Sequence, residues 1–189
     1  TMGSGLRYTA TTSFETFPFI YKQSSNFENL TSIGRTFHEF RSNLREGLRM
    51  GLTKIYNQIH NPEICLEIAN LSVDDLKKKC QKETIDLYNH LNIKKAGVIS
   101  FLDAIPLIYT MREHQVKLDR AVLAAYGWHE DSEKWGKAIQ LRHDFYEVDY
   151  LSENDRVRYT IHPEARKEVL KRLLLLNHQL QQFLLLINH

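Results

Sequence analysis

Hydrophobic residues recur every three or four positions from residue 27 to residue 59, with polar residues between them. This spacing places the apolar side chains along one side of a single long α-helix. Gly47 and Gly51 mark positions where the helix is expected to bend, and Pro62 lies just beyond its end, as a helix stop signal should. The apolar positions are Phe27, Leu30, Ile33, Phe37, Phe40, Leu44, Leu48, Leu52, Ile55 and Ile59.

The same periodicity predicts two more helices in the middle of the chain. Ser72 begins the first, with an S-x-x-D arrangement close to a capping box, and the apolar pattern continues to Leu91. The next helix is expected over residues 104–126. Pro106 is compatible with it in the first turn only, and Gly127 suits the left-handed position after the last turn.

The C-terminal part of the chain is less regular until its last stretch. Residues 128–154 mix aromatic and charged side chains without a clear period, which predicts a partly ordered connection with one short helix around 134–141. Residues 156–161 alternate polar and apolar side chains and include β-branched members, which is typical of a short strand. Pro163 then opens a final helix with apolar residues at helical spacing.

The N-terminal stretch predicts an extended arm. Residues 6–21 are dominated by β-branched and aromatic side chains, and Pro18 disfavours a helix at the residue before it. We therefore divide the chain into an extended arm, residues 1–22, and a helical C-terminal domain, residues 23–189. The expected fold is mainly α, a helical bundle of about four to five helices with a short β element formed by the arm and residues near 156–161.

Composition narrows the class of protein. The 189 residues are 42% hydrophobic and 25% charged, as in a globular chain. Their net charge is only +2, so a contact with nucleic acid would have to come from a local basic patch. Cys65 and Cys80 are too few for a disulfide framework, and no secretory leader is evident, which predicts a reduced, cytoplasmic setting. Polar residues interrupt the most apolar run, 173–187, which disfavours a membrane span.

No catalytic motif stands out in the chain. It lacks a glycine-rich phosphate loop, a GxSxG turn and an HExxH pair, and its Asn61-Pro62 pair does not continue into the motif that grips a flipped base. Two groups contain residue types that can bind a metal, but a solvated charged face explains both more simply, so we assign no catalytic, cofactor-binding or metal-binding residue. The groups are Asp144, Glu147 and Asp149 in the connection, and Glu113, His114 and Asp119 on the third helix.

Basic residues provide the strongest candidate for a binding surface. Arg41, Arg45 and Arg49 follow one another at intervals of four on the first predicted helix, and Lys54 lies near the same side. Such a stripe is about 12 Å long at a rise of 1.5 Å per residue, and its guanidinium groups match the phosphate oxygens of DNA. The alternative is a solvated helix face whose arginines pair with neighbouring glutamates.

Four stretches of the chain carry a family resemblance. They are RYTATTSFETFPF at 7–19, GLTKIYN at 51–57, LDRAVLAAYGW at 118–128, and RYTI at 158–161 followed by EVLKRLL at 168–174 and LNH at 176–178. In this order they resemble the C-terminal region of large single-chain adenine-N6 DNA methyltransferases of restriction-modification systems, of the type IIL or type IIG kind.

The resemblance implies a parent protein that methylates the exocyclic amine of adenine with S-adenosylmethionine, with or without a nuclease domain. In that family the methyl-transfer motifs lie upstream, and nothing in this chain matches them. The resemblance therefore implies that the arm, residues 1–22, follows a recognition domain absent from this chain. The chain is expected to hold no cofactor of its own and to contact the upstream recognition and methyltransferase domains. The role of Asp119 and Arg120, in the third stretch, is not fixed by the sequence.

Two functions fit these observations. The first is a non-catalytic helical module that assists recognition or clamping of double-stranded DNA, with Arg41, Arg45, Arg49 and Lys54 on the phosphates. The second is a structural scaffold or interaction module that positions the recognition and catalytic domains without touching DNA. The near-neutral charge and the abundance of apolar helix faces favour the second, whereas the arginine stripe favours the first.

Overall fold

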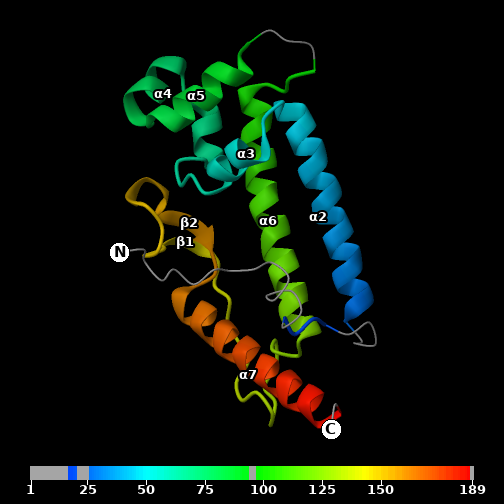
Figure 1. Ribbon diagram of the computed structural model, residues 1–189. Helices are drawn as coiled ribbons and strands as arrows, with labels where there is room; N and C mark the ends of the chain where they lie inside the picture. Colours follow the sequence, from blue (N-terminus) through cyan, green and yellow to red (C-terminus); the bar gives the residue numbers. More distant parts are fainter. Residues whose placement is uncertain (1–16, 21–25, 94–96, 188–189) are drawn as a thin grey trace, which may run out of the picture.

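The computed structural model describes residues 17–20, 26–93 and 97–187, which form six α-helices and one two-stranded sheet (Figure 1). This confirms the predicted mainly α fold with a short β element. Two long helices, α2 (Phe27–Leu48) and α6 (Phe101–Ala125), run antiparallel side by side, and the short helices gather at one end of them. The last helix, α7 (Pro163–Ile187), lies near the other end of α6.

The first predicted helix divides into α2 and α3 (Leu52–Ile59). The chain turns at Arg49, which adopts the left-handed conformation with φ of 48°. A continuous helix was therefore the wrong prediction, although the expected bend does fall between Gly47 and Gly51. Gly47 itself stays inside α2, where the side chain of Ile99 covers it. The hydrophobic spacing continues across the turn because α2 and α3 bury their apolar residues in the same core.

The second predicted helix also divides, into α4 (Val73–Lys79) and α5 (Lys82–Leu91), because Cys80 is extended. Its start is as predicted. The Ser72 hydroxyl accepts a hydrogen bond from the Asp75 N–H at 3.2 Å and donates one to the Asp75 carboxylate at 2.7 Å. A short 3-10 helix, η1 (Leu66–Asn70), precedes α4.

The third predicted helix is α6, and it begins at Phe101 rather than at residue 104. Ser100 caps it, since its hydroxyl accepts a hydrogen bond from the Asp103 N–H at 3.2 Å. Pro106 therefore lies in the second turn and not in the first, on the exposed side of the helix. The helix is nevertheless continuous through Pro106 to Ala125, and it packs against α2, α3 and α5.

The end of α6 has the predicted left-handed glycine. Gly127 has φ of +69°, its N–H donates to the Ala124 carbonyl at 2.9 Å, and the Trp128 N–H donates to the Leu123 carbonyl at 3.0 Å. This pair of bonds is the Schellman motif, in which an apolar residue after the glycine packs back on the helix. Trp128 and Leu123 do so, since both belong to the same buried cluster.

The sheet has a different pairing from the one predicted. β2 (Val157–Thr160) confirms the strand near 156–161, but its partner is β1 (Asp144–Glu147), with Asp144 opposite Thr160. Residues 17–20 of the arm contain no strand, and 1–16 and 21–22 lie outside the described residues. A hairpin is the simpler pairing, because its connection is short and holds only the 3-10 turn η2 (Glu153–Asp155).

The short helix predicted around 134–141 is wrong. The backbone there forms a turn closed by an isolated bridge between Ser132 and Gly136 and then continues without a helix, held by a hydrogen bond from the Ile139 N–H to the Trp128 carbonyl at 3.0 Å. Ile139 and Leu141 are buried, so this connection is part of a core rather than a partly ordered loop.

Two hydrophobic clusters lie at the two ends of α6. The larger joins the C-terminal half of α2, the helices α3 to α5 and the first half of α6, and the smaller joins the end of α6 to residues 128–141 and α7. None of the described helices has the length and hydrophobicity that crossing a bilayer requires.

Candidate functional site

The three arginines of the predicted stripe, Arg41, Arg45 and Arg49, form a surface that we call the α2 arginine surface. Arg41 and Arg45 lie one turn apart on α2, and Arg49 follows in the left-handed turn after its last residue. The Arg41 guanidinium lies 3.3 Å from His38 Nδ1 and 5.7 Å from the centre of the Phe37 ring. Arg45 and Arg49 are exposed.

These arginines have no carboxylate partner among the ion pairs that residues 26–93 and 97–187 form. Glu39 and Glu46, the glutamates that the alternative interpretation pairs with them, are themselves exposed and outside those ion pairs. The described residues therefore leave the guanidinium charges uncompensated at close range. An uncompensated, exposed guanidinium is the form in which arginine binds phosphate.

A turn at residues 97–99 supports the end of the α2 arginine surface. The Ile99 N–H donates to the Gly47 carbonyl at 3.1 Å, and Gly97 has φ of +80°. A Cβ at Gly97 would lie only 3.1 Å from Arg49 Nη2, so the absence of a side chain there leaves room for the guanidinium. Arg49 thus lies over this turn instead of continuing the helical stripe.

Lys54 lies on α3, apart from the helix that carries Arg41 and Arg45. It is exposed and borders a hollow of about 200 Å³ that Glu83, Asp86 and His90 also line. The negative charges of these carboxylates make the electrostatic potential around Lys54 less attractive to a phosphate. Lys54 is therefore the least favourable of the four predicted DNA-binding residues.

The acidic and histidine residues that resembled metal ligands are dispersed. Asp144 and Glu147 lie at opposite ends of β1, both exposed, and the His114 ring packs on Phe40 with ring centres 4.6 Å apart. Within the described residues no three His, Cys, Asp or Glu side chains come together as a metal site. Asp119 instead accepts a hydrogen bond from His143 Nε2 at 2.8 Å.

Sequence reasoning missed Arg112, yet it is the most extensively bonded buried side chain described. Its guanidinium donates to the carbonyls of Ile59 at 2.8 Å, Ile64 at 2.6 Å and Asn61 at 2.7 Å. Its carbon Cζ also lies 4.9 Å from the centre of the Phe145 ring. The signal that could have found it is its position, since it follows Ile108 by four residues on the apolar side of α6.

His60, beside this group, has a strongly perturbed pKa. Burial, and the positive charges of Arg158 and Arg112, lower the pKa of the imidazole from 6.5 to about 4. Its Nδ1 atom is buried and makes no hydrogen bond within the described residues. His60 is therefore neutral at physiological pH, and its charge state couples to the stability of the fold.

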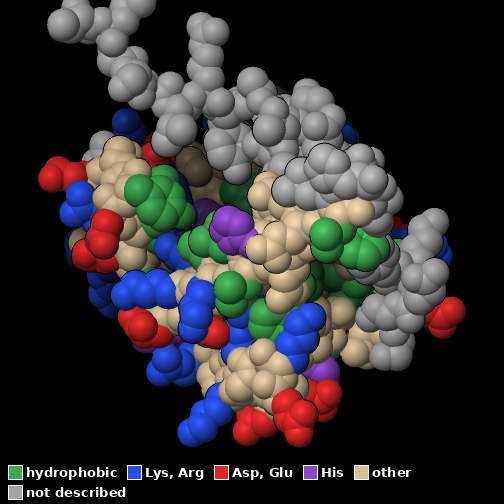
Figure 2. Space-filling view, turned by 60° about the horizontal axis from the view of Figure 1, so that its bottom comes forward, with side chains coloured by type: hydrophobic (Ala, Val, Ile, Leu, Met, Phe, Trp, Pro, Cys, Tyr) green, Lys and Arg blue, Asp and Glu red, His purple; other side chains and the backbone are tan. Residues whose placement is uncertain are grey.

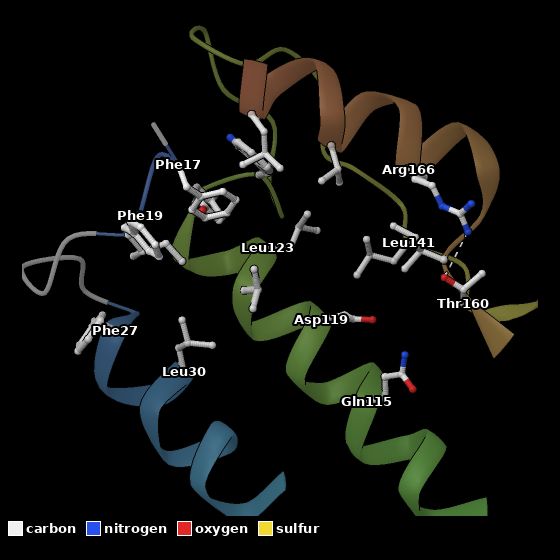
Figure 3. A pocket seen from close by; sticks show the side chains of 17 residues that line it. Phe17, Phe19, Phe27, Leu30, Gln115, Asp119, Leu123, Leu141, Thr160 and Arg166 are labelled. Carbon is white, nitrogen blue, oxygen red and sulfur yellow. Dashed lines mark hydrogen bonds between the residues drawn. The ribbon is translucent and has the colours of Figure 1, made fainter. Parts of the chain in front are cut away.

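A cavity of about 630 Å³ opens between the C-terminal half of α6, the end of β2 and the first half of α7; we call it the α6–α7 cavity. Its walls are mainly apolar. Figure 3 shows the aromatic rings of Phe17, Phe19 and Phe27 at one end and Asp119 and Arg166 at the other. Apolar walls with a few convergent polar groups are typical of a ligand site.

Two polar contacts fix the described part of the arm and the start of α2 to the end of α6, beside this cavity. The Tyr126 hydroxyl donates to the Pro18 carbonyl at 2.9 Å, and Asn26 Nδ2 donates to the Ala124 carbonyl at 3.1 Å. Tyr126 stacks on Trp128 with ring centres 4.5 Å apart, and burial raises the pKa of its hydroxyl. The aromatic end of α6 therefore holds both the arm and the connection that follows it.

The fold and these surfaces define a mainly helical module with an exposed arginine surface and an apolar cavity. No known protein family, curated protein or solved structure matches the chain.

Proposed function

We propose that this chain is the non-catalytic C-terminal helical module of a restriction-modification DNA adenine methyltransferase, and that it assists the recognition or clamping of double-stranded DNA. The parent protein would use S-adenosylmethionine in its upstream part and would act on DNA in the cytoplasm. The resemblance of the four stretches supports the parent class. Three of the four contribute side chains to the α6–α7 cavity, among them Phe17, Tyr126 and Val169, which fits a role in packing rather than in bond making.

The observation that carries the DNA contact is the α2 arginine surface, where Arg45 and Arg49 are exposed and lack a carboxylate partner in the described ion pairs. Each guanidinium can place two parallel N–H groups on one phosphate. A contact of this kind supplies affinity and orientation but no sequence information, so it suits a clamp that holds the duplex while another domain reads it.

Fluorescence anisotropy of a labelled duplex, titrated with the purified chain at several salt concentrations, tests this proposal. Replacing Arg41, Arg45 and Arg49 together by glutamine is expected to lower the affinity and to reduce the slope of log K against log salt by about 2.7, since each lost phosphate contact accounts for about 0.9.

The matched control replaces Lys77, Lys78 and Lys79 by glutamine. These lysines are exposed on α4, so their replacement removes the same amount of positive charge at another place on the surface. Affinity should fall little in that variant. Two results would reject the DNA contact: no association of the unmodified chain at about 50 mM salt, where phosphate contacts are strong, or equal losses in both triple variants.

A second candidate, a scaffold that packs against the upstream domains, is favoured by the outer face of α7. Leu170 is 54% exposed and Leu174, one turn further on, is 60% exposed, whereas the side of the helix that carries Ala165, Val169 and Leu176 packs against the smaller core. Large apolar side chains that remain exposed beside a packed face are a common mark of a surface that contacts another protein or domain. Figure 2 shows hydrophobic side chains reaching the surface at this end of the molecule, among basic and acidic ones.

Replacing Leu170 and Leu174 by glutamate tests whether this side of α7 packs against another domain of the parent protein or is exposed to solvent there. In the isolated chain the free energy of unfolding should change by less than about 0.5 kcal/mol, because exposed positions contribute little. In the parent protein the same pair should lower the melting temperature, since two charges would be buried in the contact. Tyr150→Ser, at a residue that is 78% exposed, is the control. An unchanged parent protein would count against the scaffold.

A further inference from the structure

The polar end of the α6–α7 cavity contains a carboxylate and a guanidinium that do not pair with each other. Asp119 comes from α6 and Arg166 from α7, and both line the cavity. No ion pair joins them among the described residues. Figure 3 shows the Asp119 and Gln115 side chains extending from α6 toward the side where Thr160 and Arg166 lie.

Each of the two charged groups retains hydrogen-bonding capacity for a ligand. Asp119 Oδ2 accepts from His143 Nε2 at 2.8 Å, while its other oxygen makes no hydrogen bond to a described residue. The His143 side chain is 4% exposed and that of Asp119 is 37% exposed, so the histidine lies behind the carboxylate and orients it. Arg166 Nη2 makes only a long contact of 3.4 Å to Thr160 Oγ1.

The remaining walls favour an apolar body next to these charges. Val122, Leu123, Val169 and Leu173 line the cavity, and Trp128 closes part of it. A volume of about 630 Å³ lies within the range of sites for drug-sized ligands. A ligand that fills this space must therefore combine an apolar part with both a positive and a negative group at one end.

We propose that the α6–α7 cavity binds a free α-amino acid with an aromatic side chain. The ammonium group would donate to Asp119, the carboxylate would accept two parallel hydrogen bonds from Arg166, and the ring would occupy the apolar space along α6 and α7. The amide of Gln115 and the hydroxyl of Thr160 lie at the same end and complete the polar surroundings. This inference does not rest on DNA contact, since the α2 arginine surface takes no part in it.

Isothermal titration calorimetry of the purified chain with L-phenylalanine as the probe tests the proposal. Three analogues each remove one recognised feature: phenethylamine lacks the carboxylate, 3-phenylpropionate lacks the ammonium group, and L-alanine lacks the ring. L-Phenylalanine is expected to bind saturably, and each analogue at least about tenfold more weakly, because one charge-assisted contact or the ring burial is lost.

Two variants assign the contacts. Asp119→Asn keeps an oxygen to accept from His143, and Arg166→Gln shortens a half-buried side chain, so both should fold with unchanged circular dichroism. Each should weaken L-phenylalanine binding at least about tenfold. In addition, Asp119→Asn should abolish the preference for L-phenylalanine over 3-phenylpropionate, which a merely structural role would leave intact. Glu113→Gln and Lys167→Gln, exposed on the same two helices, are the matched controls.

The proposal is overturned if L-phenylalanine shows no saturable heat up to about 10 mM, a concentration that would reveal even a millimolar dissociation constant. It is equally overturned if phenethylamine and 3-phenylpropionate bind as tightly as L-phenylalanine, because the cavity would then recognise only the ring. Unchanged binding in both Asp119→Asn and Arg166→Gln would also reject it.

Discussion

Replacing Arg112 by methionine would remove a single group that ties α6 to the segment between α3 and η1. The guanidinium donates to three backbone carbonyls, those of Ile59, Asn61 and Ile64, at distances of 2.6 to 2.8 Å. The rings of Phe145 and Tyr159 lie 4.9 and 5.5 Å from its Cζ, which also connects the hairpin to this point. Methionine fills similar space without any donor.

The expected loss follows from those contacts. A hydrogen bond from a charged donor contributes about 1.5–3 kcal/mol net, and a buried carbonyl left without a partner costs about 1–3 kcal/mol. Removing the charge also ends its desolvation cost, which offsets part of the loss, because burial already lowers the pKa of the Arg112 guanidinium. We therefore expect Arg112→Met to lower the free energy of unfolding by about 3–5 kcal/mol, a large share of the roughly 5–15 kcal/mol of a typical domain.

Urea unfolding followed by circular dichroism at about 222 nm, which reports helix throughout the chain, measures this change. Arg112→Lys should lower the free energy of unfolding by less, about 2 kcal/mol, because the lysine ammonium keeps the positive charge but cannot reach all three carbonyls at once. Arg120→Met is the matched control, since Arg120 is exposed on the same helix, and it should change stability by less than about 0.5 kcal/mol. A loss below about 1 kcal/mol in Arg112→Met would refute the reasoning.

Two further perturbations test the fold at other points. The pKa of His60 is lowered to about 4 in the folded chain, so the stability that the neutral imidazole contributes is fully present above pH 6.5 and is lost as the pH falls from 6.5 to about 4. This loss in the free energy of unfolding should be roughly 2 kcal/mol after allowing for partial exposure. His60→Asn should flatten the pH dependence of urea unfolding. Gly127→Ala should cost about 1 kcal/mol, because φ of +69° strains an alanine while no atom lies near its Cβ; Gly34→Ala, inside α2 with equally open space, should instead raise the melting temperature. An equal pH dependence in His60→Asn, or the same sign for both glycine variants, would contradict these expectations.

The hydrophobic spacing was sufficient to locate the helices because each long helix buries one continuous side. It could not locate their interruptions. At Arg49 a non-glycine residue takes a left-handed conformation, and at Cys80 the chain is extended, yet the apolar pattern continues past both points. The tertiary packing of two short helices on α6 decides these breaks, and a periodic pattern does not record it.

The sheet pairing and the connection before it depended on contacts distant in sequence. Residues 134–141 combine helix-compatible composition with a non-helical structure, because Ile139 bonds back to Trp128 and the His162 N–H donates to the Leu141 carbonyl at 2.8 Å. Those bonds join three separate segments. The mixed aromatic and charged sequence of the connection gave no period from which to infer them.

The candidate surfaces differ in how far sequence could predict them. The α2 arginine surface comes from α2 and the turn directly after it, so spacing alone suggested it, although Arg49 lies past the last helical residue and Lys54 lies on another helix. The α6–α7 cavity combines residues from the arm, α2, α6, β2 and α7. Asp119 was noted in the sequence as a residue without a fixed role, but its orientation depends on His143, which no local pattern connects to it.

The geometry of α6 makes the two proposed surfaces compatible rather than competing. α6 has 25 residues, so it is about 37 Å long at 1.5 Å per residue. The end of α2 that carries Arg45 and Arg49 lies near its beginning, whereas α7 lies near its other end (Figure 1). The cavity is at that other end too, since Asp119, Leu123 and Tyr126 line it. Substitutions separated by more than about 10 Å with no shared partner usually act independently. A duplex held at one end and a protein domain or small ligand held at the other would therefore not exclude each other, and α6 would be the rigid element that fixes the distance between them.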